Sequence, residues 1–173
     1  LVPNNIPNFN CHLIPNNMTP AQGTKGHLRR LFWTQFKISN IYKKLQANLL
    51  FSPLPEAPLF SQCRYIIMAH DLSPLRFPRT GSRLTAYFKY YIPQVLSQAE
   101  HIICNSEATA KDVTDFFKIP TKKITPIPLG YDSQRFQFLD LPTKNYFLYL
   151  GRHDHYKNLY RLIEAFANLP NSY

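Results

Sequence analysis

Two groups of residues in this sequence could carry chemistry, and the first is a histidine followed by a carboxylate. His70 and Asp71 come directly after the short apolar run 65–69. An apolar run with no polar face is typical of a strand buried in a sheet. In an open α/β sheet, ligands bind just outside the carboxyl ends of the strands. His70 and Asp71 therefore lie where a binding site is expected, although the same residues could simply cap the strand and anchor the loop after it.

The second group lies around the turn that follows another apolar run, at 146–150. Gly151 allows the backbone to turn tightly, and Arg152 and Lys157 place two cations near the start of the next helix. The N-terminus of a helix already attracts anions. The planar fork of arginine and the point charge of lysine both suit phosphate. This pattern predicts a diphosphate site, although an exposed basic loop without a ligand would contain the same residues.

The elements that must position these groups alternate along the chain. We expect strands at 48–52, 65–69, 101–104, 123–128 and 146–150, and helices at 25–45, 82–99, 107–117 and from 159 onward. Ser82 and Ser106 are good N-cap residues, whereas Pro93 predicts a kink in the second helix. A change in the phase of the apolar residues predicts a kink, or two short helices, within 25–45. Alternating strands and helices predict an α/β fold, a Rossmann-like parallel sheet with helices on both faces.

The same pattern predicts the domain organisation. Residues 1–130 form a first domain that is incomplete at its start, residues 131–145 lack periodicity and form a connector, and residues 146–173 begin a second domain. One strand and one helix cannot bury their own apolar faces, and a domain usually needs at least about 50 residues. We therefore expect a truncated second domain, or a final unit that packs on the first domain or on a neighbouring molecule, for example by domain swapping.

The composition favours a globular protein with an anionic partner. The net charge is +10, and 45% of the residues are hydrophobic. The basic segment Lys25–Lys44, which includes Trp33, could lie on an anionic membrane surface, or it could be a core-packed helix with a solvated basic face. No nucleic-acid-binding motif is present, and no nucleic-acid partner is expected. Without a signal peptide or an apolar run long enough for a span, we expect a cytoplasmic protein, with peripheral contact at the inner membrane face as an option.

Four segments, taken in order, resemble the family 4 (group 1) retaining glycosyltransferases. They are IMAHDLSP at 67–74, AEHIICNSE at 99–107, KITPIPLGYD at 123–132, and YLGR at 149–152 followed by KN at 157–158. The resemblance implies the GT-B fold, in which two Rossmann-like domains face each other across a cleft. The acceptor then binds mainly to the N-terminal domain, and the nucleotide-sugar donor binds mainly to the C-terminal domain.

The resemblance also implies roles for individual residues. His70 resembles the catalytic histidine that contacts the donor sugar, and Arg152 and Lys157, together with Gly151, resemble the site that neutralises the donor diphosphate. We assign three further residues to the cleft lining: Asp71, Ser106 and Gly130. The implied partners are a nucleotide-sugar donor and a sugar or lipid-linked acceptor, with no cofactor and no required metal. The implied function is hexosyl transfer with retention of anomeric configuration, in polysaccharide, glycolipid or cell-envelope glycan synthesis.

The sequence departs from the family pattern at two points. The family's two glutamates separated by seven residues are not reached before Tyr173, and its glycine-containing loop near the N-terminus is not visible. These departures predict a fragment that is not competent alone, and it could form a packed or domain-swapped oligomer. The alternative function is a basic, non-catalytic module that binds an anionic membrane or nucleic acid.

Overall fold

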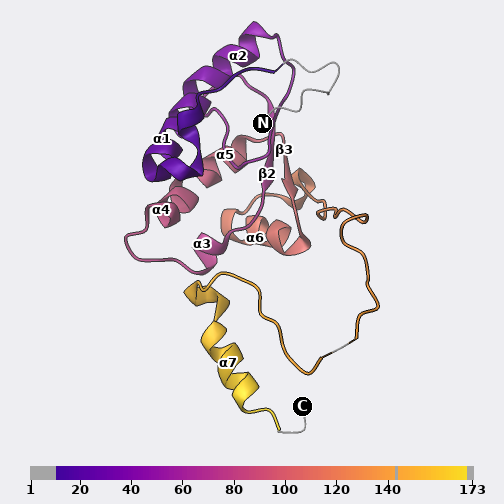
Figure 1. The fold of residues 1–173 in the computed structure, drawn as a ribbon. Helices are drawn as coiled ribbons and strands as arrows, with labels where there is room; N and C mark the ends of the chain where they lie inside the picture. Colours follow the sequence, from indigo (N-terminus) through magenta and orange to yellow (C-terminus); the bar gives the residue numbers. More distant parts are fainter. Residues whose placement is uncertain (1–10, 143, 171–173) are drawn as a thin grey trace. The chain divides into compact units, whose positions relative to one another are not determined.

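The computed structural model describes residues 11–142 and 144–170 (Figure 1). The chain divides into two compact units, Leu1–Leu129 and Gly130–Tyr173. The strands of the first unit are β1 (Leu50–Ser52), β2 (Tyr65–Ala69), β3 (His101–Cys104) and β4 (Ile124–Pro126). Its α-helices are α1 (Gly23–Trp33), α2 (Ser39–Lys44), α3 (Ser73–Arg76), α4 (Arg83–Tyr90), α5 (Ile92–Gln98) and α6 (Glu107–Phe117). Short 3-10 helices are η1 (Asn16–Met18), η2 (Pro20–Gln22) and η4 (Thr121–Lys123), and η3 (Thr34–Ile38) is a π-helical turn.

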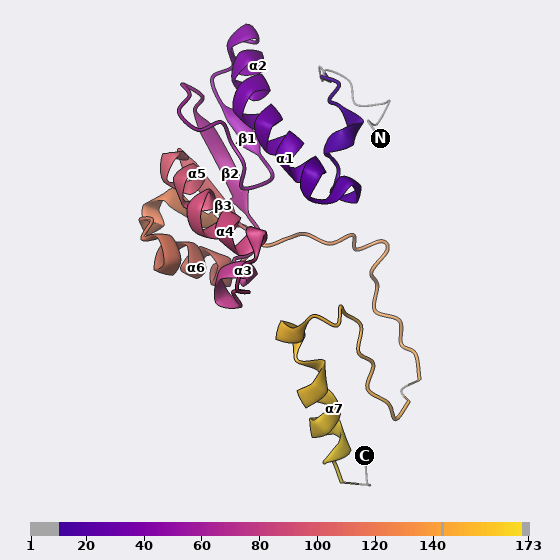
Figure 2. The same ribbon diagram turned by 90° about the vertical axis from the view of Figure 1, so that its left-hand side faces the viewer.

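The four strands form one parallel sheet in the order β1-β2-β3-β4. The register sets Ile67 opposite Ile102, and Ile102 opposite Ile124. Helices flank this sheet (Figures 1 and 2). The predicted Rossmann-like α/β fold is therefore confirmed. Because all strands run in the same direction, their carboxyl ends meet at a single edge of the sheet.

The core lies on one face of the sheet. Alternate residues of the two central strands are fully buried: Tyr65, Ile67 and Ala69 from β2, and Ile102 and Cys104 from β3. They cluster with apolar side chains of α5 and α6, namely Ile92, Val95, Leu96 and Val113. Full burial of a large aliphatic side chain contributes about 1.5–3 kcal/mol, so this layer fixes the two central strands against their helices.

A proline divides the helical segment that follows β2. Pro93 cannot donate a backbone hydrogen bond, and α4 and α5 are separated at Tyr91. The hydroxyl of Ser82 accepts a hydrogen bond from the Thr85 amide (3.3 Å), so Ser82 is the N-cap of α4. The kink predicted from Pro93 and the cap predicted from Ser82 are both confirmed.

The helical segment before the sheet is continuous from residue 23 to residue 44. The π-helical turn η3 lies inside it, between α1 and α2. A π turn adds a residue to the helical repeat, and this extra residue explains the phase change in the apolar pattern. The expected kink or pair of short helices is therefore replaced by one helix with a π turn.

The second unit contains η5 (His155–Lys157) and the amphipathic helix α7 (Leu159–Ala167). The strand predicted at 146–150 does not form, and this prediction was wrong. A strand needs a neighbour to complete its hydrogen bonds, and no strand is present within residues 144–170. The apolar pattern was instead that of a segment that packs on a helix, since the Phe147 and Phe166 rings lie edge-to-face with their centroids 5.6 Å apart.

Candidate functional site

β2 places His70 at the carboxyl edge of the sheet. His70 follows Ala69, the last residue of the strand, and its side chain is exposed. Its Nε2 lies 2.8 Å from the carbonyl oxygen of Pro53, in the loop after β1. Because a carbonyl oxygen can only accept, Nε2 must carry the proton, and Nδ1 of the neutral ring is then an acceptor. The loop after β1 therefore orients the imidazole and defines its tautomer.

The backbone of His70 is held by the start of α6. The hydroxyl of Thr109 donates to the His70 carbonyl oxygen (3.0 Å). Asn105 Oδ1 and Ser106 Oγ also lie within hydrogen-bond distance of this hydroxyl, at 3.2 and 3.0 Å. Ser106 Oγ in turn accepts from the Thr109 amide (3.1 Å), which confirms Ser106 as the N-cap of α6. The carboxyl ends of β2 and β3 are thus joined through one buried threonine.

This junction leads to a prediction about Thr109. In Thr109→Val the shape is retained but the hydroxyl is lost, so the His70 carbonyl loses its donor. We expect the free energy of unfolding to fall by about 1–2 kcal/mol, as measured by urea denaturation. Thr109→Ser should restore most of this loss. Thr114→Val is a matched control on the same helix, because the Thr114 hydroxyl donates to the Ala110 carbonyl within α6 (3.2 Å) and makes no other hydrogen bond among the described residues. Equal losses in the two valine variants would contradict the role given to Thr109.

The side chain of Asp71 stabilises the turn at the start of α3. Its Oδ1 accepts a hydrogen bond from the Ser73 amide (2.9 Å), and the side chain is exposed. α3 is then tied to α6 because the guanidinium of Arg76 pairs with both oxygens of Asp112. Of the two interpretations of Asp71, this geometry supports the loop anchor. Its assignment to the cleft lining stays a prediction.

A buried polar network, which was not predicted from the sequence, centres on Glu56 in the loop that carries Pro53. Glu56 is 5% exposed and accepts two hydrogen bonds from Arg30, at 2.8 and 2.7 Å, and one from the Tyr87 hydroxyl at 3.0 Å. Burial is the main cause that raises the pKa of Tyr87, and the charge of the Glu56 carboxylate is the second cause. Glu56 is the first acidic residue of the chain, after six cations, and this isolation was the only signal in the sequence. The network fixes the 53–58 loop, and through Pro53 it supports His70.

His27 gives this network a pH dependence. Arg30 Nη2 lies 2.9 Å from His27 Nδ1, so Nδ1 must be unprotonated. Burial lowers the pKa of His27. The Glu56 charge raises this pKa and the nearby Arg30 charge lowers it, and the net result is a lowered pKa. The Tyr87 ring packs against His27 edge-to-face, with centroids 4.9 Å apart.

Because the folded state holds His27 neutral, the unfolded chain takes up this proton first as the pH falls. The contribution of neutral His27 to the free energy of unfolding is therefore complete above pH 6.5, the ordinary pKa of histidine. This contribution is lost as the pH falls through the lowered pKa of the folded state. We therefore expect the free energy of unfolding to decrease between pH 7.5 and pH 5.5 less in His27→Asn than in the parent protein. Urea denaturation at both pH values checks this expectation. Identical decreases would show that His27 does not contribute.

The second unit brings Arg152 and Lys157 to the start of α7. Arg152 pairs with Asp154 through Nε–Oδ2 (3.0 Å) and Nη2–Oδ1 (3.2 Å), so the carboxylate occupies part of the guanidinium fork. Lys157 Nζ lies over the Tyr156 ring, 5.3 Å from its centroid, and has no ion-pair partner within residues 144–170. Gly151 allows a close approach, because a Cβ there would lie 2.9 Å from the Tyr149 hydroxyl.

Gly130, the remaining residue of the predicted site, is exposed, and a Cβ would have no atom within 4 Å. Packing therefore does not explain this glycine, and its place in the cleft lining stays a prediction. In the described residues no group of three or more His, Cys, Asp or Glu side chains is arranged to hold a metal ion. Among the helices of residues 11–142 and 144–170, none is long and apolar enough to cross a bilayer.

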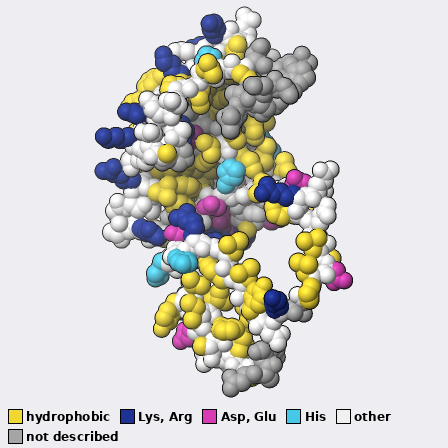
Figure 3. Space-filling model, viewed as in Figure 1, with side chains coloured by type: hydrophobic (Ala, Val, Ile, Leu, Met, Phe, Trp, Pro, Cys, Tyr) yellow, Lys and Arg dark blue, Asp and Glu magenta, His cyan; other side chains and the backbone are white. Residues whose placement is uncertain are grey.

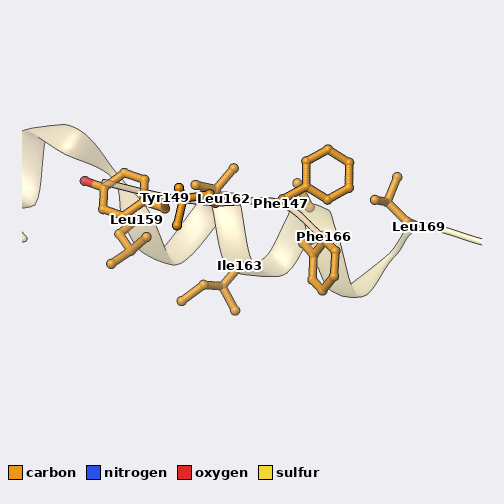
Figure 4. A pocket seen from close by; sticks show the side chains of 9 residues that line it. Phe147, Tyr149, Leu159, Leu162, Ile163, Phe166 and Leu169 are labelled. Atoms are coloured by element: carbon orange, nitrogen blue, oxygen red, sulfur yellow. The ribbon is translucent and has the colours of Figure 1, made fainter. Parts of the chain in front are cut away.

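An apolar groove of about 440 Å³ occupies the second unit (Figure 4). It is formed by one side of α7 and by the extended residues 147–149. Leu162, Ile163 and Phe166 of the helix are each about half exposed. No charged side chain lines the groove, so it offers nothing to a phosphate, and the cations of this unit lie apart from its lining.

The parallel sheet, with polar residues at the carboxyl ends of its strands, defines a Rossmann-like α/β domain. Residues 8–135 match the family model for Glycosyltransferase Family 4, and the chain belongs to this family. A search of curated proteins returns no match. Membership supports a glycosyltransferase-type function, which confirms the resemblance at the level of the family. Residues 136–173, which include Arg152 and Lys157, lie beyond the matched segment.

Proposed function

We propose that this chain is part of a retaining glycosyltransferase of the GT-B type, which transfers a sugar from a nucleotide-sugar donor to an acceptor. The observation that carries the proposal is the orientation of His70 at the carboxyl end of β2. Family membership supports the class of reaction. In the reaction the bond between the sugar C1 and the diphosphate oxygen breaks, and a bond from C1 to the acceptor oxygen forms on the same face of the sugar. The proton of the acceptor hydroxyl passes to the departing diphosphate.

In this proposal His70 contacts the donor sugar. With Nε2–H donated to Pro53, Nδ1 of the neutral imidazole accepts a hydrogen bond from a sugar hydroxyl. Thr109 and the 53–58 loop are positioning elements, because they hold the backbone carbonyl and the Nε2 atom of His70. Held in this way, the ring needs little reorganisation when the sugar binds, which favours the transition state.

Arg152 and Lys157 take the role of diphosphate ligands in this proposal. Negative charge accumulates on the diphosphate as it leaves, and fixed cations stabilise such charge most strongly in the transition state. Because Asp154 holds part of the Arg152 fork, Lys157 supplies the less compensated charge of the two. Two cations can replace a divalent metal in this role, so we expect transfer to continue in the presence of EDTA.

A panel of nucleotide sugars offered to the full-length protein tests the proposal. We expect one donor to release nucleoside diphosphate in an acceptor-dependent manner, at a rate that EDTA leaves unchanged. Failure of every donor across acceptors of the sugar and lipid-linked classes would contradict the proposed function. Transfer that EDTA abolishes would overturn the role given to the two cations.

A further inference from the structure

The outward face of the long helix at residues 23–44 carries large apolar side chains. Leu28, Phe32 and Phe36 follow one another at intervals of four residues, and they are 49%, 64% and 64% exposed. The Phe32 and Phe36 rings are stacked, with their centroids 6.2 Å apart. Three large apolar residues in line on an exposed helical face are not the pattern of a solvated helix.

Cations surround this apolar row. Lys25 and Arg29 lie beside it in α1, Lys37 lies in η3 and Lys44 ends α2, and all four side chains are exposed. No acidic residue occurs in residues 1–55, and none of these four cations forms an ion pair within the described residues. Figure 3 shows dark-blue side chains projecting from the side of the first unit where Figure 1 places α1 and α2.

The opposite side of the same helix is fixed to the domain. Arg30 binds the buried Glu56. Gln35 donates to the Ala57 carbonyl oxygen (2.8 Å) and accepts from the Leu59 amide (2.8 Å). With its inner side held in this way, the helix presents its apolar row and its cations outward without any rearrangement. Residues 23–44 span about 30 Å at the rise of a helix, which is enough to lie along a flat surface.

We propose that this face, formed by Lys25, Leu28, Arg29, Phe32, Phe36, Lys37 and Lys44, docks on an anionic lipid bilayer. The apolar row enters the boundary between headgroups and acyl chains, and the cations meet the lipid phosphates. Nucleic acid would satisfy the cations but would leave the row of Leu28, Phe32 and Phe36 exposed. A second copy of this chain docked through the same face would bring these cations together, and a different protein partner would need acidic groups around an apolar centre. The docking does not depend on the proposed transfer reaction.

Vesicle flotation with the full-length protein tests this proposal. We expect binding to vesicles of phosphatidylcholine containing phosphatidylglycerol, at least tenfold weaker binding to phosphatidylcholine alone, and weaker binding as salt rises. Phe32→Ser combined with Phe36→Ser should weaken binding by about tenfold or more. Lys37→Gln combined with Lys44→Gln should do the same, since each cation near the surface contributes about fivefold.

Matched controls distinguish vesicle binding through this face from the general effects of losing charge or apolar surface elsewhere. Lys118→Gln with Lys122→Gln removes two exposed cations outside α1 and α2, and Phe60→Ser removes a ring that is 89% exposed. Both controls should bind vesicles within about twofold of the parent protein. Absence of vesicle binding, equal losses in controls and test variants, or self-association through this face without vesicle binding would overturn the proposal. Salt-dependent binding to duplex DNA without vesicle binding would overturn it as well.

Discussion

Replacing His70 with Ala is expected to lower the rate of sugar transfer by about 100-fold or more, because a hydrogen bond oriented toward the transition state is lost. The fold should survive, since the side chain is exposed and its single hydrogen bond among the described residues is to Pro53. Losing that bond costs about 0.5–1.5 kcal/mol. The measurement is the initial rate of nucleoside diphosphate release by the full-length variant, together with its urea denaturation curve.

His101 provides a matched control for this variant. Its Nε2 also lies 2.8 Å from an oxygen, the Thr125 hydroxyl, but it is the first residue of β3 and therefore lies at the opposite edge of the sheet. His101→Ala should change stability by a similar amount and leave transfer within about twofold of the parent rate. If His70→Ala transferred sugar at the same rate as His101→Ala, the role proposed for His70 in the site would be wrong.

Lys157→Ala is the second variant with a large expected effect. Its charge has no carboxylate partner within residues 144–170, whereas the Arg152 charge is partly compensated by Asp154. Removing a cation that stabilises a leaving diphosphate lowers kcat by about 100-fold to 1,000-fold. We expect Lys157→Ala to reach this range and Arg152→Ala to have the smaller effect. Steady-state kinetics with varied donor measure kcat and KM separately.

Lys89 is the matched control for Lys157, because its Nζ lies over the neighbouring Tyr90 ring at 5.4 Å, almost the geometry of Lys157 over Tyr156. Lys89→Ala should leave kcat unchanged within about twofold. An unchanged kcat in Lys157→Ala would contradict its role in the departure of the diphosphate. A larger loss of kcat in Arg152→Ala than in Lys157→Ala would show that Asp154 does not weaken the effect of the Arg152 charge on the diphosphate.

The sequence predicted the sheet well because its strands and helices follow local rules. β3 and α6 were expected at 101–104 and 107–117, and these are their observed bounds. A buried run followed by a serine cap contains the information needed. The strand at 146–150 was predicted by the same reasoning and does not form. An apolar run shows that a segment will be covered, but it does not show whether another strand lies beside it.

The candidate site was predicted only in part, and the reason is sequence separation. His70 could be placed at a strand end from its neighbours alone. Its partners could not, since Pro53 lies 17 residues before it and Thr109 lies 39 residues after it. Glu56 was missed for the same reason, because Arg30 and Tyr87 lie 26 and 31 residues away along the chain. Local patterns place a functional side chain, and distant contacts decide which of its atoms is presented to the ligand.

The most direct test of the central claim is a proton NMR time course of transfer by the full-length protein. The coupling constant of the anomeric proton distinguishes the two configurations of the newly formed glycosidic bond. We predict that the first product carries the configuration of the donor sugar and that His70→Ala yields no detectable product in the same period. A product of inverted configuration, or normal product formation by His70→Ala, would contradict the account.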